Sequence, residues 1–365
     1  MAEPHSRRPA FGRLLEPLTV GIDIGGSKVL AGVLNGRGQV LERLRRDTPT
    51  KSPQAVEDVI VEIVHELASR HAVAAVGIGA AGFVDAGRAS VLFSPHLAWR
   101  NEPLRDALWV RLRLPIVVDN DANAAAWAES RFGAGIGRRH VLCITLGTGI
   151  GGALVLDGRV FRGANGMAGE FGHMQVVPGG HRCECGNRGC WEQYASGNAL
   201  VRDARELVLA DSPIAHYLRD LVEGDVSRLT GPMVSEAARQ GDPAAVELIA
   251  EVGDWLGVGL AGLTAGFDPD CIIVGGGVSQ AGDLLLGPAR DSFARTLTGR
   301  GFRTAPPIMP AFLGSDAGFI GAADLARSAA RRSRRSRRSH RRRMRERSGR
   351  PRRGSQRSTS VTSNE

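Results

Sequence analysis

The chain has 365 residues with a formal net charge of +9, and 42% of its residues are hydrophobic and 23% are charged. This length exceeds what one small core usually covers and favours two domains. No apolar run reaches about 18 residues and the first residues lack the apolar stretch of a secretory signal, so we expect a cytoplasmic protein without membrane contact. The five cysteines, three of them crowded together, indicate reduced thiols or a metal site and argue against a disulfide framework.

The positive charge is concentrated at the C-terminus. Residues 331–365 hold 15 arginines against two glutamates, a balance of +13, which leaves −4 for the rest of the chain. This segment has almost nothing apolar to bury, so we expect a disordered Arg/Ser-rich tail. A tail of this composition can contact nucleic acid through counterion release but has no element that reads bases. A solvated extension without a dedicated partner is the simpler interpretation.

Between residue 18 and this tail, β-branched runs alternate with Ala-rich amphipathic stretches, which is the pattern of an α/β protein. Five apolar runs each end in glycines or short polar residues, where functional groups tend to gather. These predicted strands are Leu18 to Ile24, Val73 to Ile78, Ile116 to Val118, His140 to Leu146 and Cys271 to Val274.

Two segments of the chain resemble each other. TVGIDIGGSKVLAGVLNGRGQV and VLCITLGTGIGGALVLDGRVFR align at a constant offset of 122 residues, which places Gly25 on Gly147. Each reads as a strand, a glycine-rich turn and a second strand, followed by an Asn-Gly or Asp-Gly turn typical of a β-hairpin. A duplicated domain pair, each half opening with a hairpin, explains this similarity; chance likeness between two hairpins is the alternative.

Three glycine turns are candidates for binding phosphate through backbone amides. The turn at Gly147 formally matches the dinucleotide fingerprint, but a strand follows it where that fingerprint requires a helix. The turn at Gly25 has the wrong spacing for a Walker A loop. Plain tight turns are the alternative at each position. The candidate nucleotide-binding residues are Gly25, Gly26, Ser27 and Lys28, then Gly147, Thr148 and Gly149, then Gly275, Gly276 and Gly277.

Two aspartates stand where chemistry is expected. Asp23 lies beside the first glycine pair and could hold Mg²⁺ through water, or could simply cap the turn amides. Asp121 follows Asp119 and Asn120 between an apolar strand and an Ala-rich helix that Gly133 closes. Helix amides favour the ionised form of Asp121, which suits a general base for an alcohol. Ordinary N-capping by these residues is the alternative.

The stretch from Gly169 to Gln193 contains a candidate metal site. His173, Cys183, Cys185 and Cys190 form the pattern H-x9-C-x-C-x4-C, a complete tetrahedral Zn²⁺ shell. A closed shell is structural and not catalytic, and unrelated cysteines are the alternative. Cys143 and Cys271 lie inside apolar runs and are expected to be inert.

Two glutamates flank this predicted zinc loop. Glu170 precedes His173 by three residues, and Glu192 follows Cys190 by two. A metal would fix both carboxylates as acceptors for a ligand with several hydroxyls. Exposed loop glutamates without a ligand are the alternative.

The chain resembles the ROK family (repressor, open reading frame, kinase), most closely its bacterial glucokinases. The resemblance covers Leu18 to about Ala329. The motifs that carry it are GIDIGGSK, GAAGFVD, VVDNDANAAAWAE, LGTGIGGALVLDG, RGANGMAGEFGH, CECGNRGCWEQYASG and IIVGGGVS. Ala81 stands where many members have proline, and the Arg/Ser-rich tail has no counterpart in the family pattern.

The resemblance implies an actin-like pair of α/β domains around a cleft, transfer of the ATP γ-phosphate to a hexose 6-hydroxyl, and a dimer or tetramer. Asp121 matches the catalytic base, and Asn120, Glu170, His173 and Glu192 match sugar-contacting positions. The three glycine turns and Asp23 match the nucleotide side. We expect an extension over 1–17, a small domain over 18–118 plus about 312–330, a large domain over 119–311 with the zinc loop 169–193, and the tail 331–365.

Two alternatives to a glucokinase stay open. The first is a sugar-responsive repressor, although the residues before Leu18 are too few for a helix-turn-helix. The second keeps the kinase and changes a substrate, with N-acetylmannosamine, N-acetylglucosamine, fructose or allose as acceptor or polyphosphate as donor. Only the resemblance of GAAGFVD and SPHLAW favours glucose, since a single hydroxyl contact can decide between sugars.

Overall fold

The computed structural model describes residues 17–95 and 97–331. Most of the predicted extension and tail therefore lie outside the described residues. The described chain up to Arg327 belongs to one compact unit, and all features below lie within it. The described residues form three sheets and eight α-helices, α1 to α8, and a further helix begins at residue 317.

The first five-stranded sheet has the order β3-β2-β1-β4-β8. Its strands are β1 (Leu18–Ile24), β2 (Lys28–Leu34), β3 (Val40–Asp47), β4 (Val73–Ala80) and β8 (Ile116–Asn120). β1, β2 and β3 pair antiparallel, whereas β1, β4 and β8 run parallel. Helices α1 (Pro53–Arg70) and α2 (Leu104–Leu112) bury apolar side chains in the core of this sheet. Ser52 caps α1 by accepting a hydrogen bond from the amide of Ala55.

The second five-stranded sheet repeats this arrangement in the order β11-β10-β9-β12-β13. Its strands are β9 (Val141–Leu146), β10 (Ile150–Leu156), β11 (Arg159–Phe161), β12 (Cys271–Gly275) and β13 (Ile308–Pro310). The predicted offset of 122 residues carries β2 onto β10 residue for residue. The duplicated α/β fold predicted from the sequence is therefore confirmed. Its division at residues 118 and 312 stays a prediction.

The two related hairpins differ at their tips. Asp157 and Gly158 have φ of 51° and 68° and close β10 onto β11 as a two-residue turn of type I′. In the first copy, Leu34 pairs with Val40, so five residues form the loop. The Asn35 side chain accepts hydrogen bonds from the amides of Arg37 and Gln39 and holds this longer loop.

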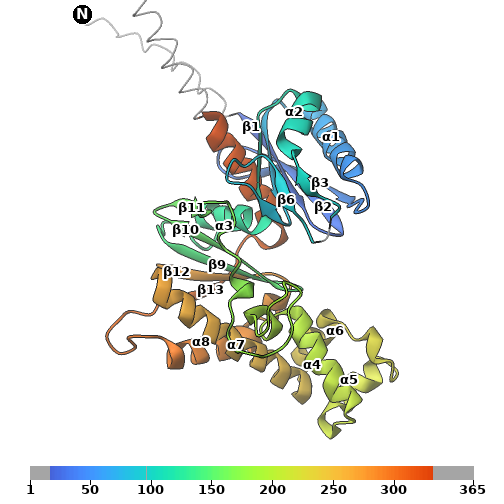
Figure 1. Cartoon of the computed structure of the whole chain (residues 1–365), viewed down its shortest axis with the longest axis vertical. Helices are drawn as coiled ribbons and strands as arrows, with labels where there is room; N and C mark the ends of the chain where they lie inside the picture. The colour runs from blue at the N-terminus through green and yellow to red at the C-terminus, as the bar shows by residue number, and fades with distance from the viewer. Residues whose placement is uncertain (1–16, 96, 332–365) are drawn as a thin grey trace, which may run out of the picture. The chain divides into compact units, whose positions relative to one another are not determined.

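A helical layer covers one face of the second sheet (Figure 1). Its helices are α4 (Gly197–Leu209), α5 (His216–Leu221), α6 (Gly231–Arg239), α7 (Pro243–Phe267) and α8 (Asp283–Thr296). By length and composition alone, α7 could cross a membrane, but its most apolar stretch is 61% buried within the fold. That burial is typical of a core helix, and it accounts for the apolar composition.

Helix α3 (Asp121–Phe132) contacts strands of both sheets. It begins where β8 ends and is followed by Gly133, as the sequence predicted. The helix that begins at residue 317 packs closely on the first sheet, because a Cβ on Gly21 or Gly77 would collide with its backbone. A small third sheet contains β5 (Phe83–Val84), β6 (Val91–Phe93) and β7 (Arg100–Glu102).

Candidate active site

The carboxyl ends of three parallel strands bring the first acidic residues together. Asp23 on β1, Gly79 on β4 and Asp119 on β8 are register partners across the sheet. A Cβ on Gly79 would lie 3.5 Å from Cα of Asp121 and 3.6 Å from Oδ1 of Asp23. Because Gly79 has no side chain, nothing at this position fills the space between Asp23 and Asp121.

Asp23 has an unusual electrostatic environment. Burial raises the pKa of its carboxyl from 3.8 to about 7; the nearby Asp121 adds to the rise and Lys28 opposes it. Its carboxylate also contacts the backbone at Gly318, where no side chain intervenes. A carboxyl with a raised pKa becomes a good cation ligand once a cation stabilises its charge.

Asn120 and Asp121 have different roles at the N-terminus of α3. Asn120 is the N-cap, and its Oδ1 accepts a hydrogen bond of 3.0 Å from the amide of Asn123. Its Nδ2 donates to Oδ1 of Asp121 at 2.9 Å, and the amide of Ala122 donates to the same oxygen at 2.9 Å. These donors and the helix dipole stabilise the Asp121 anion. Since Asn120 performs the capping, capping alone does not account for Asp121.

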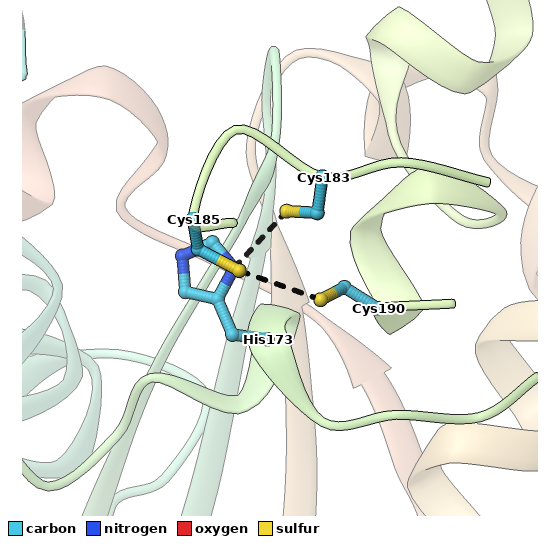
Figure 2. A group of neighbouring side chains, drawn as sticks. All are labelled: His173, Cys183, Cys185 and Cys190. Atoms are coloured by element: carbon cyan, nitrogen blue, oxygen red, sulfur yellow. Dashed lines mark hydrogen bonds between the residues drawn. The ribbon is translucent and has the colours of Figure 1, made fainter. Parts of the chain in front are cut away.

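The predicted zinc ligands converge on one point (Figure 2). The ligand atoms of His173, Cys183, Cys185 and Cys190 lie within 4.8 Å of one another. Sγ of Cys185 lies 3.6 Å from Sγ of Cys190, and Sγ of Cys183 lies 3.6 Å from Nδ1 of His173. Zinc–ligand bonds of about 2.0–2.3 Å in a tetrahedron give edges of about 3.5–3.8 Å. The four residues therefore fit a structural Zn²⁺ and leave no position open.

The loop around these ligands is attached to the helical layer through Trp191. This side chain is fully buried, and its Nε1 donates a 2.8 Å hydrogen bond to the carbonyl of Trp255 on α7. The ring lies against Gly259 of the same helix, where a Cβ would collide with it. Trp191 stands between Cys190 and Glu192 in the chain, so its burial fixes both neighbours.

Glu192 connects the metal centre to the second glycine turn. Its Oε1 accepts from Sγ of Cys183 at 3.0 Å and lies 3.3 Å from Nδ1 of His173. A Cβ on Gly149 would lie 2.5 Å from its other oxygen, Oε2. One carboxylate therefore contacts candidate zinc ligands on one side and the turn at Gly149 on the other.

Glu170 belongs to the same group of charges. Desolvation raises the pKa of its carboxyl, Asp121 and Glu192 reinforce the rise, and His173 opposes it. Asp121, Glu192 and His173 therefore lie within electrostatic range of Glu170. Four of the residues predicted to bind or activate a sugar are thus brought together in one neighbourhood, and Asn120 joins them through its hydrogen bond to Asp121.

The glycine turns at Gly147 and Gly276 lie next to each other, and the turn at Gly147 is also bonded to the start of α4. The carbonyls of Gly147 and Thr148 accept hydrogen bonds from the amides of Gly197 and Asn198, at 2.8 and 3.1 Å. A Cβ on Gly276 would collide with the backbone of Leu146, so the third turn packs against the end of β9 beside the second. A 3₁₀ turn over Val278–Ala281 follows Gly277, and α8 begins only after it.

The first glycine turn ends β1 of the other sheet. The amide of Gly25 donates to the carbonyl of Lys28 at 3.0 Å, which closes the turn, and Thr48 donates to the carbonyl of Gly25 at 2.8 Å. Ser27 and Lys28 are exposed, as a phosphate-contacting hydroxyl and ammonium need to be. Gly25 and Gly26 are partly buried beneath them.

Two arginines that were not predicted as site residues lie near this group. Arg88 and Arg162 both pair with the buried carboxylate of Asp119, two residues before Asp121. Arg162 opens the motif RGANGMAGEFGH, which is the only sequence signal that could have drawn attention to it.

Comparison with known proteins identifies the family. The ROK family model matches residues 19–329. The chain is 49% identical over 310 residues to the glucokinase of Streptomyces coelicolor, covering 85% of this chain and 98% of that protein. It is 36% identical over 325 residues to the glucokinase of Thermotoga maritima, covering 84% and 96%.

A solved structure agrees with these relatives. The ROK family glucokinase from Streptomyces griseus, in complex with glucose and AMPPNP, has 51% sequence identity and a TM-score of 0.78 and covers 85% of this chain and 99% of that one. The resemblance predicted from the sequence motifs and the actin-like ATPase fold are confirmed. The chain belongs to the ROK family.

Proposed function

We propose that this protein is a glucokinase that transfers the γ-phosphate of ATP to the 6-hydroxyl of D-glucose. The observation that carries the proposal is the grouping of Asp121 with Glu170, His173 and Glu192 beside a metal-binding loop. The similarity to glucokinases over most of the chain supports the same activity.

Asp121 is the proposed catalytic base. Its carboxylate is stabilised as an anion by the amide of Ala122 and the start of α3, so it can accept the hydroxyl proton as the oxygen attacks phosphorus. The amide Nδ2 of Asn120 orients the Asp121 carboxylate and also donates to the carbonyl of Gly82 at 3.2 Å. This bond ties the base to the loop that follows β4.

Glu170, His173 and Glu192 are the proposed sugar-binding residues. Carboxylates accept hydrogen bonds from hydroxyl groups, and a ligand with several hydroxyls requires acceptors held at fixed positions. The zinc loop supplies that fixation, because Glu192 follows the ligand Cys190 by two residues and the buried Trp191 between them is attached to α7. Zn²⁺ bound here has a structural role.

The glycine turns are the proposed nucleotide-binding elements. Backbone amides at the turns around Gly147 and Gly276 and the ammonium of Lys28 provide donors for phosphate oxygens. Asp23 is the residue proposed to hold Mg²⁺, which neutralises phosphate charge when bound. The Asp23 carboxyl lies near Asp121, so this side adjoins the proposed base.

The experiment that tests the proposal is a substrate panel. Each sugar is assayed as acceptor, once with ATP and once with polyphosphate as the phosphate donor, and kcat/KM is compared. The sugars are glucose, N-acetylmannosamine, N-acetylglucosamine, fructose and allose. We expect the highest value for glucose with ATP. A higher kcat/KM for another sugar or for polyphosphate would mean that the protein is a kinase with a different substrate. No transfer to any sugar, together with sugar-dependent DNA binding in a gel shift, would favour a repressor.

We propose a cytoplasmic location and a homo-oligomer, either a dimer or a tetramer. Light scattering on the purified full-length chain tests the oligomeric state. A gel shift with and without residues 331–365 tests whether the tail binds nucleic acid, and we expect any such binding to weaken with salt and to show no sequence preference.

A further inference from the structure

Asp119 is the most densely paired carboxylate near the proposed site. Its side chain is 2% exposed and receives two guanidinium groups. Arg162 approaches with Nε at 3.1 Å from both oxygens and Nη2 at 2.5 Å from Oδ2, and Nη2 of Arg88 lies 2.9 Å from the same Oδ2. Asn123 and the amide of Asn120 donate to Oδ1 at 3.3 and 3.1 Å.

These contacts engage all three nitrogens of the Arg162 guanidinium. Its Nε and Nη2 are directed at Asp119, and its Nη1 donates to the carbonyl of Val160 at 3.1 Å. A fork of this kind fixes the geometry between two segments, because bidentate pairing tolerates little rotation. The pair is therefore suited to holding other residues in place.

The pair joins the two segments that carry the proposed base and one proposed sugar acid. Asp119 is on β8 of the first sheet, two residues before Asp121. Arg162 directly follows β11 of the second sheet and begins the segment that ends at Glu170. The ion pair thus fixes the end of β8 to the start of the acid-bearing loop.

The loop from Arg162 to Glu170 is closed on itself and is held to the fold at two glycines, while residues 163–165, 167 and 170 are exposed. The amide of Ala168 donates to the carbonyl of Arg162 at 3.1 Å. A Cβ on Gly166 would lie 2.9 Å from the amide of Ala86, and one on Gly169 would lie 2.5 Å from the carbonyl oxygen of Gly152. Gly166 and Gly169 therefore hold the loop against neighbouring segments close to Glu170, and Arg162 holds its start beside Asp119.

We propose that Asp119 and Arg162 are positioning residues that set the distance between the base Asp121 and the sugar-binding Glu170. Arg88 completes the ion cluster from the turn that follows β5. This inference rests on the proposed function, since it assigns a purpose to the pair in sugar phosphorylation. It differs from a stability role in that it predicts a selective effect on the sugar side of the reaction.

The kinetic test uses Arg162→Lys, Arg162→Gln and Asp119→Asn in the full-length, zinc-loaded enzyme. Arg139→Gln is the matched control, because Arg139 pairs with Asp157 in an exposed turn, where both side chains are more than half exposed. We expect KM for glucose to rise about tenfold or more in Arg162→Gln and Asp119→Asn, with KM for ATP changed less than about twofold, since misplaced reacting groups carry costs of this size. In Arg162→Lys the rise in KM for glucose should be smaller than in Arg162→Gln. The double variant Asp119→Asn/Arg162→Gln should raise KM for glucose little more than either single substitution does.

A second measurement does not depend on activity. Hydrogen exchange of the amides over 163–170 should be faster in Arg162→Lys than in the wild type, and unchanged in Arg139→Gln. Unchanged exchange in folded Arg162→Lys, or parallel increases of both KM values in the other variants, would overturn the inference. If the wild-type enzyme phosphorylates no sugar, the proposed function fails, whereas a sugar kinase with normal kinetics in all three variants would refute the positioning role alone.

Discussion

Oε1 of Glu192 lies 3.0 Å from Sγ of Cys183, so a proposed sugar acceptor is in direct contact with a proposed zinc ligand. The same oxygen lies 3.3 Å from Nδ1 of His173, which belongs to both groups. The candidate metal centre and this proposed sugar acceptor therefore lie side by side, and loss of the metal should weaken sugar binding.

Removing one zinc ligand should remove sugar affinity as well. Cys185 is the exposed member of the four, so Cys185→Ser introduces no buried defect. We expect elemental analysis to show zinc lost and calorimetry to show glucose affinity reduced at least about tenfold, because changes around a metal site typically cost 10–100-fold. Cys271→Ala, in the core of the second sheet, should keep both properties. Full glucose affinity in a zinc-free variant would separate the metal from the site.

Asp121→Asn should abolish most of the chemistry and leave the structure intact. The amide keeps an oxygen that can accept the hydrogen bond of Ala122 but cannot take a proton from the sugar hydroxyl. We expect kcat to fall about 10²- to 10⁴-fold with zinc content and melting temperature close to those of the wild type. Asp291→Asn on the exposed surface of α8 is the control. Near-normal turnover of Asp121→Asn would remove Asp121 as the base.

Asp23→Asn should change the pH dependence of stability. The pKa of Asp23 rises from 3.8 to about 7 on folding, so the fold favours the protonated form. Stability from this group is present below about pH 4 and is lost as the pH rises through about 7. The neutral asparagine escapes that loss, so urea unfolding should show a gain over wild type at pH 8, of at most about 4 kcal/mol, and little gain at pH 4.5. An equal effect at both pH values would contradict the raised pKa. Activity should fall even though stability rises, because the proposed Mg²⁺ ligand is lost.

Two glycines of α7 should respond in opposite directions to the same substitution. A Cβ on Gly259 would collide with the ring of Trp191, whereas one on Gly262 meets no atom within 4 Å. Gly259→Ala should lose about 1–3 kcal/mol of unfolding free energy through overpacking and should raise KM for glucose, because Trp191 adjoins Glu192. Gly262→Ala should gain about 0.5–1 kcal/mol, since alanine is the better helix former. Chemical denaturation measures both, and equal effects would show that the Trp191 contact does not matter.

Local signals in the sequence predicted a large part of this structure. The five strand predictions match β1, β4, β8, β9 and β12, because apolar runs bounded by glycine are local features. The zinc ligands were found because their spacing lies within one short loop, and their convergence supports that prediction. The roles of the catalytic and binding residues stay predictions.

Other features depend on tertiary contacts that no local pattern carries. Asp119 and Arg162 are 43 residues apart, one on β8 and the other directly after β11 of the second sheet, so their pairing has no signature in periodicity or spacing. The same holds for Gly79, whose missing side chain brings Asp23 near Asp121. The longer loop after Leu34 was not distinguished from the tight turn at Asp157, because both copies contain an Asx-Gly pair.

Phosphorus NMR of a mixture of the enzyme, Mg-ATP and glucose shows directly whether the γ-phosphate is transferred to the sugar. A glucose 6-phosphate resonance should grow in step with ADP, and neither should appear with Asp121→Asn over the same time. ADP formed without a sugar phosphate, or no turnover by zinc-loaded wild-type enzyme, would contradict this transfer.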